Sequence, residues 1–249
     1  MKFAYDIPGY VQGHRFSDEP EYYNSTTGRF TDLAGGDRFD QYVSKVNGTP
    51  AFADRGANSR RGLYLDNTNH WQFPHACPWE GSGVLVAQYN VVSGAAVGYI
   101  YSHIFAEDTG TITNNPMLFA QYYSGNPLFR VWGGAGQLVS DVSLVDDAIM
   151  VFAWSRAQDD RIARVTTDGV SITVSSAYNP TNTNGNFIGL GGQPRCRLGN
   201  IDATGGTTAS TQGTMHIFEQ HFFKTNILRD HLAYTKAFID TLKTYYRAT

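Results

Sequence analysis

The sequence predicts an all-β protein of antiparallel strands with one C-terminal helix and an irregular N-terminal arm. Residues 147–176 contain apolar runs rich in Val and Ile, bounded by Asp, Gly and Ser, which is typical of strands joined in a meander. Charged residues make up only 16% of the 249-residue chain, which also holds 26 Gly, 15 Tyr and 15 Phe. This composition argues against a disordered chain and a solvated helical bundle, and favours a turn-rich β protein.

The first 30 residues differ from the rest. Pro8, Gly9, Gly13 and Pro20, and a polar run over 24–28, interrupt any strand or helix period. We therefore predict an N-terminal arm over 1–30 and one domain over 31–249. Aromatic residues on such an arm need a surface to dock on, either the chain's own domain or a neighbouring subunit.

Apolar runs predict the strands and the helix that follow. The expected strands are 61–67, 82–92, 98–105, 117–123, 128–132, 148–154, 161–166, 170–174, 187–192 and 213–224. Asp168-Gly169 predicts a tight hairpin turn, since Gly supplies a positive φ. A helix is expected over 225–246, with Thr225 or Asn226 as its N-cap. The apolar residues that fall near helical spacing there are Leu228, Leu232, Ala233, Phe238, Ile239 and Leu242.

Charge and targeting signals narrow the functional classes. The net charge is −3 and the Lys and Arg residues are scattered, which argues against a nucleic-acid partner. No apolar stretch approaches the length of a membrane span, and the N-terminus lacks the apolar region of a secretory signal peptide. Cys77 and Cys196 are expected to be separate buried thiols, because two distant cysteines make no disulfide framework.

Segments 30–35, 62–67, 83–89, 149–154, 162–170, 213–223 and 227–246 follow one another in a recognisable order. Together they resemble concanavalin A-like lectin/glucanase domains, in particular laminin-G-like domains of bacterial and phage proteins. The resemblance covers about residues 29–249 and implies an antiparallel two-sheet jelly-roll sandwich. Phe30, Asn67 and Tyr89 stand where the family pattern has Trp, Gly and Trp.

The hydrolases of that family carry three carboxylates alternating on one strand, so that two of them flank a glycosidic bond. The nearest segment here, Glu19-Pro20-Glu21-Tyr22-Tyr23-Asn24, lacks the last carboxylate and lies in the arm, and Glu219 is alone on its strand. We therefore expect no catalytic residues and no enzymatic activity. A lyase remains the alternative, with His103 and either Tyr101 or Tyr123 as base and acid.

Strand alternation predicts one polar and aromatic surface. The condition is that Ile100, Ser102 and Ile104 face the core on the first strand, Leu118 and Ala120 on the second, and Phe129 and Val131 on the third. The alternate positions of each strand then face outward, and they share one surface if the three strands are neighbours. The residues expected there are Tyr99, Tyr101, His103, Gln121, Tyr123, Arg130 and Trp132. Aromatic rings stack on the C–H faces of sugars, while the polar groups make directional hydrogen bonds. This surface therefore predicts carbohydrate contact, with burial under the arm or a partner, or catalysis, as alternatives.

No metal or cofactor site has a diagnostic spacing. His216 and His221 are five residues apart, so a regular strand would point them to opposite faces. Four loop residues offer oxygen ligands of the kind that calcium prefers, namely Asp66, Asp108, Asn114 and Asp202. We expect no cofactor, and calcium is the metal ion that these loop residues would suit.

These observations favour a non-catalytic module that binds host-surface polysaccharide, carried by the fibre or spike of a phage or phage-like particle. The expected location is a virion or an extracellular particle. The expected partners are the polysaccharide, other particle subunits bound through residues 1–30, and further copies of the chain. The alternatives are a polysaccharide lyase or hydrolase acting on bacterial surface glycan, and a structural virion subunit that uses a lectin-like scaffold.

Overall fold

The structure is a computed structural model, and its described residues are 3–33, 43–44, 51–55, 60–65, 70–72, 81–91, 98–104, 117–123, 126–132, 139–156, 162–177, 195–199 and 213–249. In several strands the backbone is described and the side chains are not.

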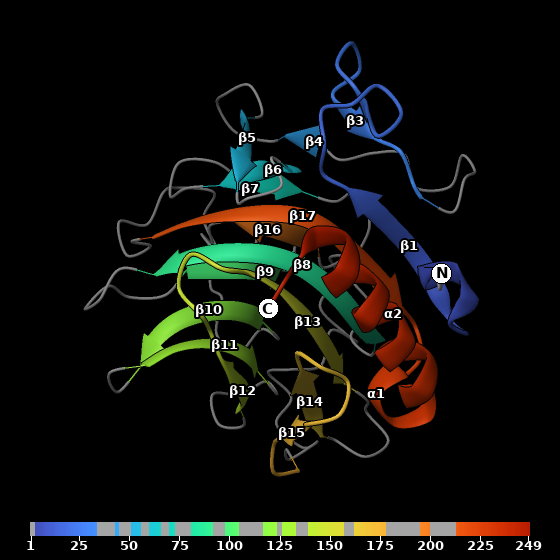
Figure 1. Ribbon diagram of the computed structural model, residues 1–249, viewed down its shortest axis with the longest axis vertical. Coiled ribbons are helices and arrows are strands. Elements are labelled where there is room, and N and C mark those ends of the chain that lie inside the picture. Colours follow the sequence, from blue (N-terminus) through green and yellow to red (C-terminus); the bar gives the residue numbers. More distant parts are fainter. Residues whose placement is uncertain are drawn as a thin grey trace.

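Two antiparallel sheets dominate the chain (Figure 1). The larger sheet runs in the order β15 (Thr173–Val174), β14 (Ala163–Thr166), β13 (Ile149–Arg156), β8 (Gly81–Val91), β17 (Gly213–Phe223), β6 (Arg60–Leu65) and β5 (Ala51–Arg55), with β1 (Tyr10–Arg15) also paired to β17. The smaller sheet runs in the order β12 (Val139–Ser143), β11 (Asn126–Trp132), β10 (Met117–Tyr123), β9 (Gly98–Ile104), β16 (Arg195–Gly199), β7 (His70–Gln72) and β4 (Val43–Ser44). The predicted all-β class with a C-terminal helix is confirmed.

Short elements complete the described part of the chain. They are a 3-10 turn, η1 (Ala4–Asp6), a small hairpin, β2 (Tyr23–Asn24) with β3 (Arg29–Phe30), and two C-terminal helices, α1 (Ile227–Asp230) and α2 (Leu232–Tyr246). Within the described residues, no helix is both long and apolar enough to cross a membrane.

The larger sheet is buried on both faces. On β8 every side chain from Ser82 to Tyr89 is buried, which explains why this strand has a nearly continuous apolar sequence rather than strict alternation. One face, through residues such as Leu85 and Phe152, packs against Phe129 and Val131 of the smaller sheet. The other face packs against α1, α2 and η1 in a second core. The helices therefore cover the side of the larger sheet that faces away from the smaller sheet (Figure 1).

The second core contains residues from both ends of the chain. Its members are Ala4, Ile7, Val84, Val86, Ile149, Val151, Ala153, Phe218, Phe223, Ile227, Leu228, Phe238, Ile239, Leu242 and Tyr246. Each Å² of apolar surface that such a cluster removes from water stabilises the fold by about 25 cal/mol, so the burial of these side chains contributes strongly to folding. The two chain ends are thus structural parts of the same layer.

The N-terminal segment contains a strand where we expected an irregular arm. β1 pairs with the second half of β17, from Tyr10 opposite Phe223 to Arg15 opposite Glu219. Gly13 allows this close approach, since a Cβ there would overlap the ring of His221. The glycine that we took for a breaker is therefore required by the pairing. The segment docks on the chain's own sheet, although the division at residue 30 stays a prediction.

The predicted C-terminal helix is present but divided. Asn226 caps α1, its side chain accepting a hydrogen bond from the backbone N–H of Arg229, as expected. The helix is interrupted at His231, whose φ of −133° is not helical. The buried hydroxyl of Thr235 donates to the carbonyl oxygens of Ile227 and His231, and so joins the two helices across the break.

The tight turn predicted at Asp168-Gly169 is wrong. β14 ends at Thr166 and β15 starts at Thr173, so the connection is longer than two residues. Gly169 does have a positive φ of 68°. The carboxylate of Asp168, however, accepts hydrogen bonds from the N–H groups of Val170 and Ser171 and closes a local loop before pairing resumes.

A register shift in β17 corrects the prediction for its two histidines. The pairing of β17 with β8 shifts between Ile217 and Glu219, which marks a β-bulge. Before the bulge His216 alternates with the core residue Ile217, and after it His221 alternates with the core residue Phe222. Both histidines consequently lie on the face away from the inter-sheet core, although a regular strand would have placed them on opposite faces.

The strands β2, β3, β4, β5, β7, β12 and β16 were not predicted as strands either. The predicted strand over 187–192 lies outside the described residues.

Candidate functional site

The predicted carbohydrate surface depends on three strands being neighbours, and they are. β9, β10 and β11 are adjacent in that order in the smaller sheet. Arg130 is paired with Phe119, Leu128 with Gln121 and Asn126 with Tyr123. Phe129 and Val131 are fully buried in the inter-sheet core, as the prediction required.

The alternation between β9 and β10 is less regular than the prediction assumed. Their register shifts between Leu118 and Phe119, so Tyr101 pairs with Leu118 while Tyr99 pairs with Phe119. His103, on the same strand, pairs with Cys196 of β16 on the other side. For six predicted residues only the backbone is described, so their side-chain positions stay a prediction: Tyr99, Tyr101, His103, Gln121, Tyr123 and Trp132.

Arg130 is the predicted site residue whose side chain the structure describes. It is paired with Asp141 of β12, and its guanidinium lies 3.4 Å from the Asp141 carboxylate. The Arg130 side chain is 14% exposed and the Asp141 side chain 37%. The cation of the predicted surface is thus mostly covered and already has an anionic partner.

A second group of polar residues is buried where β17 meets both ends of the chain. Glu219 of β17 accepts hydrogen bonds from Arg15 of β1, at 3.0 Å, and from the hydroxyl of Tyr246 of α2, at 2.6 Å. Nε2 of His221 lies 2.8 Å from the other carboxylate oxygen. An ionised carboxylate only accepts hydrogen bonds, so Nε2 is the donor. We call Arg15, Glu219, His221 and Tyr246 the buried ionic cluster.

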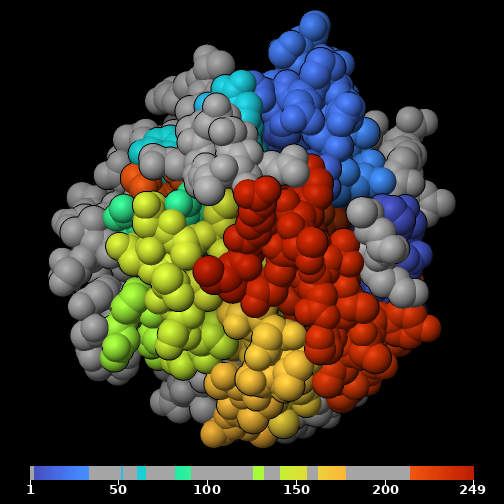
Figure 2. Space-filling view, in the orientation of Figure 1, coloured from blue at the N-terminus to red at the C-terminus, as the bar shows by residue number. Residues whose placement is uncertain are grey.

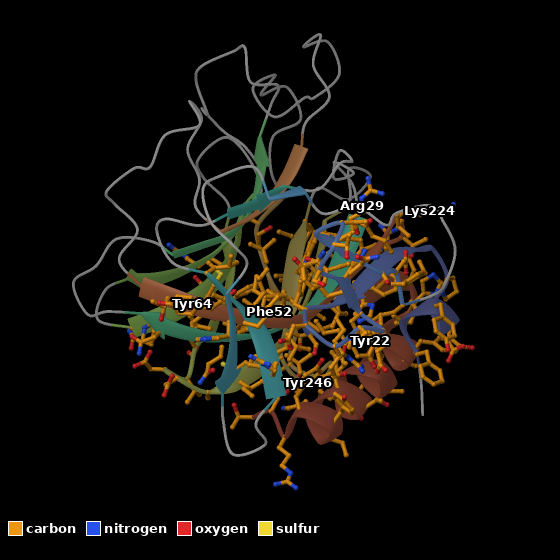
Figure 3. All side chains as sticks on the ribbon, turned by 90° about the horizontal axis from the view of Figure 1, so that it is seen from above. Tyr22, Arg29, Phe52, Tyr64, Lys224 and Tyr246 are labelled. Atoms are coloured by element: carbon orange, nitrogen blue, oxygen red, sulfur yellow. The ribbon has the colours of Figure 1, made fainter. Side chains whose placement is uncertain are left out.

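Aromatic rings cover the outer side of this cluster. The guanidinium of Arg15 lies 4.9 Å from the ring centre of Tyr22 and 4.6 Å from that of Tyr245, and it donates a hydrogen bond to the Tyr22 hydroxyl at 2.8 Å. Tyr22 and Tyr246 lie near each other in Figure 3. The blue N-terminal segment lies beside the red C-terminal helix in Figure 2. The cluster therefore joins β1 at one chain end and α2 at the other to β17 of the larger sheet.

Electrostatics keep Glu219 ionised. Burial by itself would raise the pKa of Glu219, but the hydrogen bond from His221, the charge of Arg15 and the hydroxyl of Tyr246 outweigh it and lower the pKa to about 2. A general acid needs a carboxyl group that is protonated near neutral pH. Glu219 is 3% exposed and deprotonated, so the cluster suits a structural ion pair rather than catalysis on a polymer.

The other acidic residues considered for catalysis do not form a group. Glu19 and Glu21 lie at exposed positions of the N-terminal segment. Among the described side chains, no three His, Cys, Asp or Glu residues gather into a metal-binding cluster. The loop residues considered for calcium, Asp66, Asp108, Asn114 and Asp202, lie outside the described residues.

Sequence reasoning missed the buried ionic cluster because its members are far apart in the chain. Arg15 and Glu219 are separated by 204 positions, and Glu219 and Tyr246 by 27. A local signal did exist, since Glu219 and His221 lie between the aromatic residues Phe218 and Phe222 of one strand. A buried carboxylate needs partners, but the strand does not say which residues supply them.

Comparisons with known proteins identify the architecture. No protein-family model matches the chain, and no curated protein matches it significantly in sequence. Domain 4 of AbnA, an arabinanase of Geobacillus stearothermophilus solved with arabinotriose, superposes with a TM-score of 0.55 at 15% identity. The match covers 87% of this chain and 93% of that domain.

Two larger proteins contain a similar unit. One is botulinum neurotoxin type C, whose cell entry depends on interaction with two ganglioside molecules. Its structure matches with a TM-score of 0.57 at 8% identity, over 96% of this chain and 53% of that chain. Trypanosoma rangeli sialidase in complex with sialic acid matches with a TM-score of 0.56 at 14% identity. The match covers 98% of this chain and 34% of the sialidase chain. This chain thus spans about half of the neurotoxin chain and about a third of the sialidase. At these identities the likeness shows a shared β-sandwich fold.

Proposed function

We propose that this chain is a non-catalytic carbohydrate-binding module. The observation that carries the proposal is the similarity to AbnA domain 4, because that structure holds an arabinotriose and its domain is matched almost end to end. The neurotoxin and sialidase similarities add that the same sandwich recurs in proteins studied with gangliosides and sialic acid. Because one fold serves many functions, the sugar must be sought at a site on this chain.

The surface formed by β9, β10 and β11 is the proposed sugar site. The three strands are neighbours, and their sequences supply rings and polar groups at Tyr99, Tyr101, His103, Gln121, Tyr123, Arg130 and Trp132. Sugars are bound by aromatic rings that stack on their C–H faces and by polar groups that hydrogen-bond their hydroxyls.

The non-catalytic part of the proposal rests on the state of the carboxylates. Glycoside hydrolysis requires two carboxyl groups that face one bond, one of them protonated at the start of the reaction. Of the five Glu residues in the chain, Glu219 is buried, ionised and engaged by three side chains. Glu19 and Glu21 are exposed and lie away from a core strand.

The finer proposal concerns the setting. We propose that the ligand is a bacterial surface polysaccharide and that the chain belongs to a fibre or spike of a phage or phage-like particle. Its N-terminal segment would then contact other particle subunits, and the chain would form a homo-oligomer. This setting comes from the family resemblance in the sequence, and the proposed location is a virion or an extracellular particle.

The test is binding to a glycan array and to purified bacterial surface polysaccharide. Trp132→Ala and Tyr123→Ala should each weaken binding on the order of ten-fold or more, as expected for central aromatic contacts. Tyr234→Ala is the matched control, because Tyr234 is 48% exposed on α2, on the opposite side of the sandwich.

The outcomes separate the alternatives. Binding that the two variants lose and the control keeps, with no shortening of the polysaccharide, supports the proposal. Shortening of the polysaccharide by the wild type would point to a lyase or hydrolase. Absence of binding by the folded protein would contradict carbohydrate recognition and favour a structural subunit.

A further inference from the structure

The three strands β10, β11 and β12 are almost free of charged residues. Their sequences are MLFAQYY, NPLFRVW and VSDVS, and their charged residues are Arg130 and Asp141. The same sequences contain Phe119, Tyr122 and Tyr123 on β10, and Trp132 on β11. This part of the smaller sheet therefore combines a high aromatic content with a formal charge of zero.

The two charges neutralise each other. Arg130 and Asp141 are direct register partners on adjacent strands, the arrangement in which opposite charges attract across a sheet. Nη2 of Arg130 lies 3.4 Å from Oδ2 of Asp141. The guanidinium thus has a carboxylate within ion-pair distance before any ligand arrives.

The two partners are unequally accessible. The Asp141 side chain is 37% exposed and the Arg130 side chain 14%. A ligand that approaches this place meets the carboxylate more readily than the guanidinium. An anionic ligand would have to displace Asp141 from Arg130, or lie beside a like charge, and both cost free energy.

We propose that the Arg130–Asp141 pair makes this surface select uncharged glycans over acidic ones, with Asp141 as the residue that sets the selectivity. The inference rests on the proposed function, because it assigns the substrate class of the same site. Sugar hydroxyls both donate and accept hydrogen bonds, so a neutral glycan can bond to the ion pair without breaking it. A uronate or sialic acid carboxylate can only accept, and it competes with Asp141.

The experiment compares affinities for a panel of neutral polysaccharides, such as arabinan and dextran, with those for acidic ones, such as polysialic acid and alginate. The wild type should bind its best neutral glycan at least about ten-fold more tightly than any acidic one. Asp141→Asn removes the negative charge and keeps the shape. It should shift the ratio of acidic to neutral affinity toward acidic glycans by about five-fold at low ionic strength, the scale of a partly exposed ion pair, and less at high ionic strength.

Two further variants show whether the shift comes from Arg130. Adding Arg130→Gln to Asp141→Asn should abolish the gain in acidic affinity, because the cation that attracts the acidic glycan is then gone. Asp240→Asn is the matched control, since Asp240 pairs with Lys236 on the exposed face of α2 and should leave the ratio unchanged. Circular dichroism of every variant verifies that it is folded.

The outcomes distinguish this inference from the proposed function. A wild type that prefers acidic glycans, or an Asp141→Asn variant with an unshifted ratio, would overturn the role of Asp141 while carbohydrate binding stands. A folded wild type that binds no member of either class would contradict the proposed function, and this inference with it.

Discussion

Two arginine–carboxylate pairs in this molecule have different surroundings. Arg15 and Glu219 approach to 2.9 Å, and the Glu219 side chain is 4% exposed and bonded also to His221 and Tyr246. Arg130 and Asp141 are 3.4 Å apart, with the aspartate 37% exposed. Water therefore reaches the carboxylate of the second pair much more readily than that of the first. The first pair therefore joins both chain ends to the larger sheet, while the second is the pair that we propose to act in ligand selection.

Breaking the buried pair should have the largest effect. Glu219→Gln leaves Arg15 without its counter-charge in a mostly buried place, and we expect a loss of about 3 kcal/mol or more in the free energy of unfolding. Chemical denaturation followed by circular dichroism measures it. Asp240→Asn, which removes one partner of an exposed helical pair, should change it by less than about 0.5 kcal/mol. Equal losses in the two variants would show that the cluster is not a structural centre.

Acid should remove the same contribution from the wild type. The ordinary pKa of the Glu219 carboxyl is 4.5, and in the folded protein it is about 2. A lowered pKa contributes stability above pH 4.5, and this contribution is lost as the pH falls toward 2. The shift corresponds to about 3 kcal/mol. Denaturation curves between pH 6 and about pH 2 should show this loss in the wild type and a smaller one in Glu219→Gln.

A second carboxylate titrates in the same pH range and needs its own control. Burial would raise the pKa of Asp168, but hydrogen bonds from the backbone N–H groups of Val170 and Ser171 lower it to about 2. The same denaturation curves for Asp168→Asn separate the acid-induced loss of stability that is due to Asp168 from the loss that is due to Glu219. If Glu219→Gln and the wild type lose the same stability in acid, Glu219 is not the group responsible.

Breaking the Arg130–Asp141 pair should affect folding much less than breaking the buried pair. Asp141→Asn is expected to change the free energy of unfolding by less than about 1 kcal/mol, because the carboxylate is partly solvated and the pair is screened. The same denaturation assay measures it. A loss as large as that of Glu219→Gln would mean that both pairs are structural, and it would weaken the argument that Asp141 is kept for ligand selection.

The features that sequence could predict are those written in local patterns. Continuous apolar runs predicted the central strands β8, β13 and β17, and Asn226 predicted a helix cap that the structure confirms. Alternation on β11 correctly placed Phe129 and Val131 in the core. In each case the residues that decide the structure lie within a few positions of one another.

The features that sequence missed depend on distant partners or on one-residue shifts. Gly13 suggested a break, but it is the residue that lets β1 lie against His221. The bulge near Phe218 moves every later side chain of β17 to the opposite face of the sheet from the one that regular alternation predicts. No local sequence pattern indicated this bulge. Asp168-Gly169 predicted a tight turn, but the Asp168 carboxylate accepts hydrogen bonds from two N–H groups further along the chain and forms a longer loop. For the candidate site, the strands and their order were predictable, whereas the partner of Arg130 was not.

Both chain ends belong to the layer on the outer side of the larger sheet, and this has a consequence for orientation. Ala4 and Ile7 belong to the same buried core as residues of α2, and the N–H of Thr249 donates to the carbonyl of Ile149 on β13. A protein joined to either end would therefore be tethered on the helix side. The outward face of β10, β11 and β12 would then point away from the attached protein, because the smaller sheet packs on the opposite side of the larger sheet.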